Sequence, residues 1–164
     1  MSKRKDEKIL VCDDDNQFRQ TVCKLLESEG YHVVAASSGK EAIEKAKELY
    51  YDLVVMDVRM PDIDGIETLK KIREIHGDHP TAIIVVTGFA SEDAPIEALK
   101  LGASDYILKP FEMSDFLHSV NRNLEVVTAL KDREYFYRRM LAKSEQLQLT
   151  ENEIKELRKQ LGEA

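Results

Sequence analysis

The stretch that decides the fold is ILVCDDD, residues 9–15. Four apolar residues run without alternation into three aspartates. A short run of this kind is typical of a strand that is buried on both faces of a parallel sheet. Four further runs have the same character and cover residues 31–36, 53–56, 82–86 and 106–108. The sequence therefore predicts five strands of one parallel sheet.

Segments with a helical period of apolar residues separate these runs. The expected helices cover residues 16–29, 39–49, 66–75 and 91–101, and a fifth follows residue 111. Gly30 and Gly102 stand where two of these helices should end. Pro95 falls in a first turn, where its missing N–H costs little. Alternating strands and helices predict a doubly wound α/β fold of the (βα)5 type, with helices on both faces of the sheet.

The composition favours one water-exposed domain and disfavours a membrane protein. The 164 residues are 43% hydrophobic and 34% charged. The net charge of -7 belongs to residues 1–123, which carry 16 basic and 23 acidic residues, whereas residues 124–164 carry 8 of each. Cys12 and Cys23 form no disulfide framework, and the basic residues 1–7 lack the apolar core of a signal peptide. The expected compartment is the cytoplasm.

The residues that directly follow four of the five apolar runs form a candidate site. Asp13, Asp14 and Asp15 follow the first run, Asp57 the third, Thr87 the fourth and Lys109 the fifth. Ligands of doubly wound sheets bind beyond the carboxyl ends of the strands. Because parallel strands end at one edge of the sheet, we expect these side chains to converge there.

Clustered carboxylates of this kind favour a bound cation. Two carboxylates about 4 Å apart repel by about 4 kcal/mol at an effective dielectric near 20. Oxygen ligands without histidine or cysteine favour Mg²⁺. One carboxylate can then act as a nucleophile on phosphorus, while Lys109 stabilises the developing charge and the Thr87 hydroxyl bonds a phosphoryl oxygen.

Four sequence motifs resemble those of one family. They are VCDDD (residues 11–15), VMDVRMPDIDG (55–65), VTG (86–88) and GASDYILKPF (102–111), in the family's order and spacing. Over roughly residues 6–123 the chain resembles the receiver domains of two-component response regulators. The resemblance implies the flavodoxin-like strand order 2-1-3-4-5 and a regulatory phosphoacceptor domain, with no enzymatic activity beyond its own phosphotransfer and autodephosphorylation.

The resemblance also implies the metal site and the phosphoacceptor. Asp57 matches the residue that receives a phosphoryl group from a histidine kinase or phosphotransfer protein. Asp13, Asp14 and Asp57 match the Mg²⁺ ligands, together with the backbone carbonyl of Arg59.

Further matches concern the response to phosphorylation. Thr87 and Lys109 match the two residues that contact the phosphoryl group, and the bond from Lys109 to Pro110 is commonly cis in the family. Tyr106 matches the aromatic switch residue, and the signal is expected to pass through the fourth helix, fifth strand and fifth helix. A half-buried core tyrosine is the alternative for Tyr106.

Other interpretations of the aspartates stay open. Asp15 or Asn16 is expected to cap the following helix. Asp13 and Asp15 also resemble the D-x-D pair of an aspartyl-nucleophile phosphatase of the haloacid dehalogenase group. A scaffold in which phosphorylation is incidental is a second alternative.

The C-terminal part predicts a long helix. We expect three parts, a tail over residues 1–7, a receiver domain over 8–123 and a helical extension over 124–164. Leu147, Ile154 and Leu161 recur at heptad spacing with Leu157 between the last two, which favours a coiled-coil homodimer, although the stripe slips near residues 143–146. A solvated single helix is the alternative.

The partner and the output of the extension have further alternatives. A nucleic-acid patch at residues 133–139 is disfavoured because Asp132 and Glu134 dilute its charge. The chain could also be the receiver part of a larger regulator with an ATPase, a cyclic-dinucleotide enzyme or a kinase as its effector.

Overall fold

The computed structural model describes residues 5–88, 94–100 and 102–162. Within these ranges strands and helices alternate along the chain. The strands are β1 (Lys8–Cys12), β2 (His32–Ala36), β3 (Leu53–Met56), β4 (Ala82–Thr87) and β5 (Asp105–Leu108). The helices are α1 (Asn16–Ser28), α2 (Gly39–Glu48), α3 (Gly65–His76), α4 (Ala94–Lys100) and α5 (Met113–Gln160).

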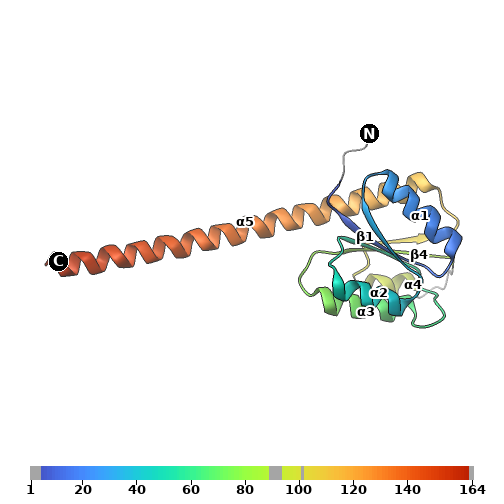
Figure 1. Cartoon of the computed structure of the whole chain (residues 1–164), viewed down its shortest axis with the longest axis horizontal. Helices are drawn as coiled ribbons and strands as arrows, with labels where there is room; N and C mark the ends of the chain where they lie inside the picture. The colour runs from blue at the N-terminus through green and yellow to red at the C-terminus, as the bar shows by residue number, and fades with distance from the viewer. Residues whose placement is uncertain (1–4, 89–93, 101, 163–164) are drawn as a thin grey trace. The chain divides into compact units, whose positions relative to one another are not determined.

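The strands form one sheet in the order β2-β1-β3-β4-β5 (Figure 1). Every neighbouring pair is parallel, with Cys12 beside Met56 in the β1–β3 pair and Thr87 beside Leu108 in the β4–β5 pair. This confirms the predicted five-stranded sheet and its strand order. The carboxyl ends of all five strands therefore lie along one edge.

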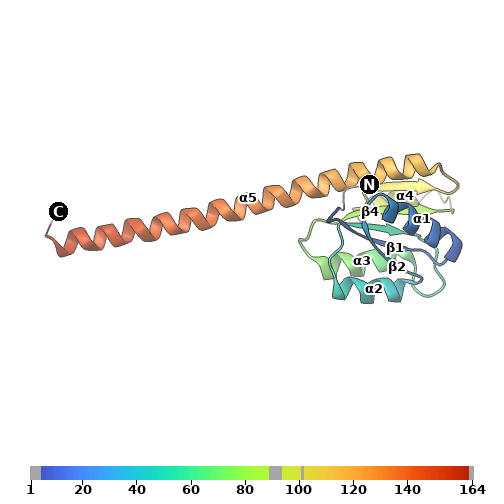
Figure 2. The same ribbon diagram turned by 45° about the horizontal axis from the view of Figure 1, so that its top comes forward.

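Two layers of helices cover the sheet (Figure 2). On one face, Val22 and Leu26 of α1 and Phe116 of α5 join a core with the alternate strand residues, such as Ile9 and Val11. On the other face, α2, α3 and α4 bury a second core that includes Leu10, Val54, Leu69 and Ala98. The alternation of strand side chains divides each apolar run between the two cores.

The outer strands differ from the fully buried strands that the sequence predicted. All side chains of β3 and β4 are buried, but β2 and β5 are only partly so. The order of the strands explains this, because β2 and β5 are the two edges of the sheet. Among the described residues, helix and strand ends agree with the expected ranges to within a residue or two. Ser91 and Leu101, the expected first and last residues of the fourth helix, lie outside the described residues.

The chain divides into two compact units, Met1–Val127 and Thr128–Ala164. In the first unit α5 buries its apolar stripe, including Phe116, Val120, Leu124 and Val127. In the second unit the large apolar side chains, from Leu130 to Leu161, are exposed. The predicted long helix is therefore observed, while its pairing into a coiled coil stays a prediction. Among the described residues, no helix is both long and apolar enough to cross a bilayer.

Candidate functional site

The pairing of β1 with β3 brings the first two acidic segments together. Cys12 and Met56 are register partners at the ends of these strands, so Asp13 and Asp57 follow them side by side. The backbone N–H of Asp57 donates to the carbonyl of Cys12 at 3.0 Å. This hydrogen bond continues the ladder and holds the two aspartates at the edge of the sheet.

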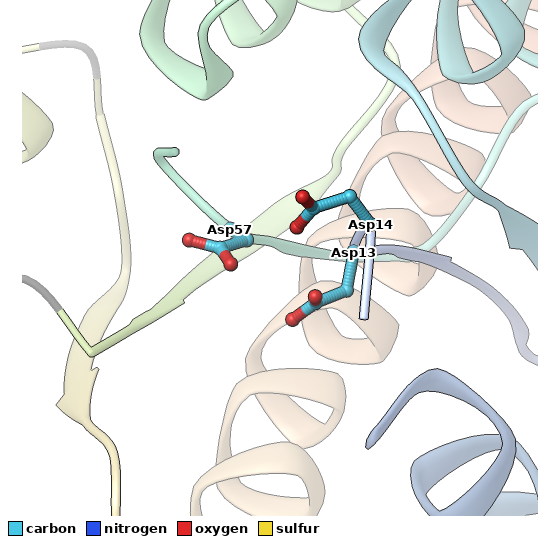
Figure 3. A group of neighbouring side chains, drawn as sticks. All are labelled: Asp13, Asp14 and Asp57. Atoms are coloured by element: carbon cyan, nitrogen blue, oxygen red, sulfur yellow. The ribbon is translucent and has the colours of Figure 1, made fainter. Parts of the chain in front are cut away.

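Asp13, Asp14 and Asp57 form a carboxylate cluster (Figure 3). One carboxylate oxygen from each lies within 4.8 Å of the others. Asp13 and Asp57 are buried, whereas Asp14 is exposed. The cluster is thus anchored in the protein on two sides and open to solvent at the third. Strand-end position in the sequence predicted this convergence.

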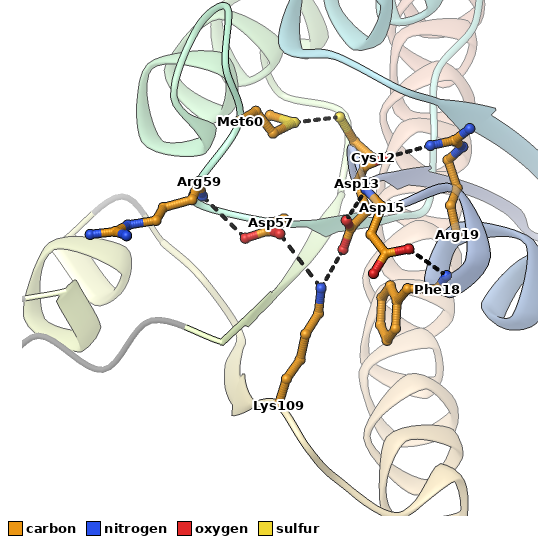
Figure 4. Close-up of polar contacts among 9 residues, drawn as sticks. All are labelled: Cys12, Asp13, Asp15, Phe18, Arg19, Asp57, Arg59, Met60 and Lys109. Atoms are coloured by element: carbon orange, nitrogen blue, oxygen red, sulfur yellow. Dashed lines mark hydrogen bonds and ion pairs between the residues drawn. The ribbon is translucent and has the colours of Figure 1, made fainter.

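Lys109 reaches the same cluster from the end of β5 (Figure 4). Its Nζ lies 2.7 Å from Oδ2 of Asp13 and 3.5 Å from Oδ2 of Asp57. The backbone N–H of Lys109 donates to the carbonyl of Thr87 at 2.9 Å, which fixes the residue beside the end of β4. The bond from Lys109 to Pro110 is cis. One ammonium therefore offsets the charge of two buried carboxylates.

Opposing effects act on the pKa of the Asp13 carboxyl group. Burial raises the pKa of its carboxyl group, and the hydrogen bonds from Lys109 and from the N–H of Asp15 oppose that rise without cancelling it. A further cation beside Asp13 would favour its ionised form. The charge of the site therefore favours the binding of a further cation.

Thr87 and Tyr106 flank the cluster. Thr87 is the last residue of β4 and is 1% exposed. Tyr106 is half-buried in β5 and packs against the core that α2, α3 and α4 cover. Burial raises the pKa of the Tyr106 phenol, and the charge of Asp57 adds to the rise. The half-buried position suits either of the roles considered for Tyr106, and its role as a switch stays a prediction.

Arg59 and Asp15 form hydrogen bonds beside the cluster, Arg59 through its backbone N–H and Asp15 through its side chain. The N–H of Arg59 donates to Oδ1 of Asp57 at 3.1 Å, so the segment after β3 orients the Asp57 carboxylate. Asp15 caps α1, because its Oδ1 accepts from the N–H of Phe18 at 3.1 Å. This confirms the expected cap at Asp15. A role of the Arg59 carbonyl as a metal ligand stays a prediction.

Sequence reasoning missed two residues that contact the cluster and a third that caps α2. Phe18 lies with its ring 3.9 Å from Nζ of Lys109. Arg19 donates from Nη1 to the backbone carbonyl of Asp13 at 2.7 Å. Asp62 accepts from the backbone N–H groups of Lys40 and Gly39 at the start of α2. Backbone hydrogen bonds, from Lys40 first and then from Ile63 and Gly39, lower its pKa to about 2. No spacing rule links these residues to their partners, which lie elsewhere in the chain.

Fold and cluster together define the receiver class of signalling domains. Residues 9–121 match the response regulator receiver domain family. The chain belongs to this family, whose members act in two-component signalling and carry an aspartate phosphoacceptor site.

Similar proteins include both short and long regulators. Over 118 residues the chain is 39% identical to the chemotaxis protein CheY of Bacillus subtilis (strain 168), covering 71% of this chain and 97% of that protein. Over 131 residues it is 37% identical to the transcriptional regulatory protein ZraR of Escherichia coli (strain K12), covering 74% of this chain. It spans only 29% of the length of ZraR.

A solved structure shows the same fold. The response regulator TrrA of Thermotoga maritima, in complex with Mg²⁺ and BeF, has a TM-score of 0.63 and 31% identity. The match covers 71% of this chain and 98% of that one. The carboxylates of Asp13, Asp14 and Asp57 are the kind of acidic triad that holds Mg²⁺ in receiver domains.

Proposed function

We propose that the protein is a phosphorylation-dependent switch that accepts a phosphoryl group on Asp57. The placement of Asp57 carries this proposal: its carboxylate lies in a cluster with Asp13 and Asp14, and 3.5 Å from the ammonium of Lys109. An anionic phosphoryl group needs positive charge around a carboxylate nucleophile, and this is the place where the chain gathers it.

The proposed reaction is a phosphoryl transfer. A carboxylate oxygen of Asp57 attacks the phosphorus of a phosphohistidine on a histidine kinase or a phosphotransfer protein. A P–O bond forms while the P–N bond breaks, and the imidazole leaves with the bonding electron pair. Lys109 offsets the negative charge on the phosphoryl oxygens, and the hydroxyl of Thr87 donates to one of them.

Mg²⁺ fits the oxygen ligands of this site. Asp13, Asp14 and Asp57 would hold the ion together with the backbone carbonyl of Arg59, and bound Mg²⁺ would neutralise charge on the phosphoryl group. The protein's own contribution is to keep Asp13 buried and oriented. The N–H of Asp15 does this by donating to Oδ1, whereas the ammonium of Lys109 donates to Oδ2 and would share that carboxylate with the ion.

The aspartyl-nucleophile phosphatase is the weaker candidate. That reading pairs Asp13 with Asp15, but an oxygen of Asp15 caps α1. Asp57, in contrast, faces Asp13 across the β1–β3 pair (Figure 4). Turnover of a phosphate monoester that survives Asp57→Asn would reverse this preference.

The signal leaves the site, in this proposal, through Thr87 and Tyr106 to the surface of α4, β5 and α5. A phosphoryl group brings extra negative charge and acceptor oxygens, to which Thr87 and Lys109 respond. Because the cytoplasm is where histidine kinases deliver phosphoryl groups, we place the protein there. The output is either this chain's own assembly or an effector of a longer regulator. The second possibility is motivated by the greater length of the transcriptional regulatory protein ZraR, of which the chain spans 29%.

The second unit supports assembly into a homodimer. Exposed apolar side chains recur every seven residues at Met140, Leu147, Ile154 and Leu161, with exposures of 45% to 74%. The same register includes Val126, two heptads before Met140 and at the end of the first unit. Phe136 and Leu157 occupy the intervening heptad positions of the same register. A single heptad register therefore continues through residues 143–146. Two of its core positions, Arg133 and Lys143, are charged.

Charge favours a parallel pair in this register. Glu153 and Arg158 occupy the g and e positions, where the helices of a parallel dimer place them opposite one another. Sedimentation tests the proposal: protein with Mg²⁺ and beryllofluoride should differ from untreated protein in mass or shape, and Asp57→Asn should abolish the difference. An identical sedimentation profile in all three samples would contradict the proposal that phosphorylation changes the assembly.

A further inference from the structure

Phe18 contacts the working end of Lys109. Nζ of Lys109 lies 3.9 Å from the centroid of the Phe18 ring, on the opposite side of the pocket from Arg59 (Figure 4). The position of Phe18 is set by α1, because the Asp15 carboxylate accepts from its backbone N–H at 3.1 Å. The N-cap that starts α1 therefore also aims an aromatic ring at the site.

Two further aromatic side chains, Phe111 and Phe116, continue the contact from Phe18 into the core. Phe111 meets Phe18 edge to face, with centroids 5.9 Å apart and an interplanar angle of 86°. The centroid of the Phe111 ring in turn lies 5.6 Å from that of Phe116, a fully buried residue of α5. A row of three rings thus runs from Lys109 into the core, and only the first one contacts the ammonium.

We propose that Phe18 is a positioning residue for Lys109. A lysine has a flexible stem and three N–H donors, so two carboxylates alone leave its ammonium free to pivot. The face of an aromatic ring attracts a cation and excludes water from the third side. Phe18 therefore holds the ammonium between Asp13 and Asp57, where it meets a phosphoryl group on Asp57. This inference rests on the role of Lys109 in the proposed function.

The alternative is that Phe18 is only a packing residue of α1. The two explanations separate by substitution: Phe18→Leu keeps apolar bulk and removes the ring face, whereas Phe18→Tyr and Phe18→Trp keep a ring face. Leu25→Ala is the matched packing control, because Leu25 is a partly buried residue of α1 against the same core. Thermal melting verifies that each variant is folded.

The first measurement uses metal-free protein and NMR of the lysine side chains. Protons on Cε of Lys109 lie near the ring face, so its ring current should shift them upfield of solvated lysines. Lys109→Arg assigns the signal. Phe18→Leu should remove the upfield shift, and Phe18→Tyr, Phe18→Trp and Leu25→Ala should keep it. A Lys109 signal that is unshifted in the wild type, or unchanged in Phe18→Leu, would overturn the proposal.

The second measurement is the Kd for beryllofluoride with Mg²⁺ in excess. A cation–π contact of this kind predicts about twofold to thirtyfold weaker binding in Phe18→Leu. The ring variants should restore binding, and Leu25→Ala should leave it unchanged. Equal Kd values for the wild type and Phe18→Leu would contradict the proposal. If the wild type shows the ring-current shift but binds no beryllofluoride, the proposed function fails and the placement of Lys109 by Phe18 stands.

Discussion

The ammonium of Lys109 forms a 2.7 Å ion pair with Oδ2 of Asp13, although 96 residues separate them in the chain. Asp13 is 2% exposed, so this contact is the compensation for a buried charge. The same oxygen belongs to the carboxylate that we propose as a metal ligand. Lysine and metal therefore compete for Asp13 in the resting protein.

Removing the lysine should tighten metal binding. We expect Lys109→Met to bind Mg²⁺ about threefold to tenfold more tightly than the wild type, because a competing and repelling positive charge is gone. Titration calorimetry measures the Kd, with Lys24→Met on the exposed side of α1 as the control. Weaker Mg²⁺ binding in Lys109→Met would show that the lysine organises the ligands instead of competing with the ion.

His76 should make the stability of the domain depend on pH. It is buried at the end of α3, with Nδ1 3.0 Å from Oγ1 of Thr81, and that hydroxyl donates to the carbonyl of Tyr51 at 2.8 Å. The hydroxyl therefore accepts from Nδ1–H. Burial, with His79 nearby, lowers the pKa of His76 from 6.5. The unfolded chain then takes up a proton at a higher pH than the folded protein does.

The sign of the effect follows from this order. The free energy of unfolding should be constant for this group above pH 6.5 and should fall as the pH drops from there through the lowered pKa. Urea unfolding at a series of pH values should show a shallower decline in His76→Gln. His118→Gln, on the exposed surface of α5, should decline as the wild type does. Parallel curves for His76→Gln and the wild type would rule His76 out as the cause.

Gly65 should tolerate no side chain. A Cβ there would overlap the carbonyl oxygen of Asp57 and lie 2.8 Å from Cα of Val58, so α3 could start only by moving the phosphoacceptor segment. We expect Gly65→Ala to lower the free energy of unfolding by about 1–3 kcal/mol and to slow phosphorylation. Gly88→Ala is the control near the site, because among the described residues its Cβ would meet nothing nearer than Cβ of Lys109 at 4.0 Å. Similar losses in both variants would contradict this reading.

The heptad register makes a prediction about two neighbouring exposed residues of α5. Ile154 lies on the proposed seam, whereas Leu149 lies off it, and both side chains are exposed in the single chain. Ile154→Lys should therefore shift the protein from dimer to monomer in sedimentation equilibrium, and Leu149→Lys should not. A monomeric wild type, or equal effects of the two substitutions, would remove the coiled coil from the account.

Strand-end logic predicted the cluster because it depends only on topology. Once β1 and β3 are neighbours in a parallel sheet, Asp13 and Asp57 must lie together, and Lys109 follows from β5. The contact of Phe18 with Lys109 could not be predicted in this way, because it depends on side-chain directions and not on periodicity. The same holds for Asp62, whose carboxylate reaches back to cap α2. The partial exposure of β2 and β5 was missed because near-continuous apolar runs look alike in central and edge strands.

The most direct test of the account is where a phosphoryl group attaches. The purified protein, incubated with Mg²⁺ and a small acyl phosphate donor, should gain the mass of one phosphoryl group in intact mass spectrometry. The gain should be absent in Asp57→Asn and after Mg²⁺ is chelated, and borohydride trapping should mark residue 57. Phosphorylation that persists in Asp57→Asn, or a wild type that gains no mass, would contradict the proposal that Asp57 is the phosphoacceptor.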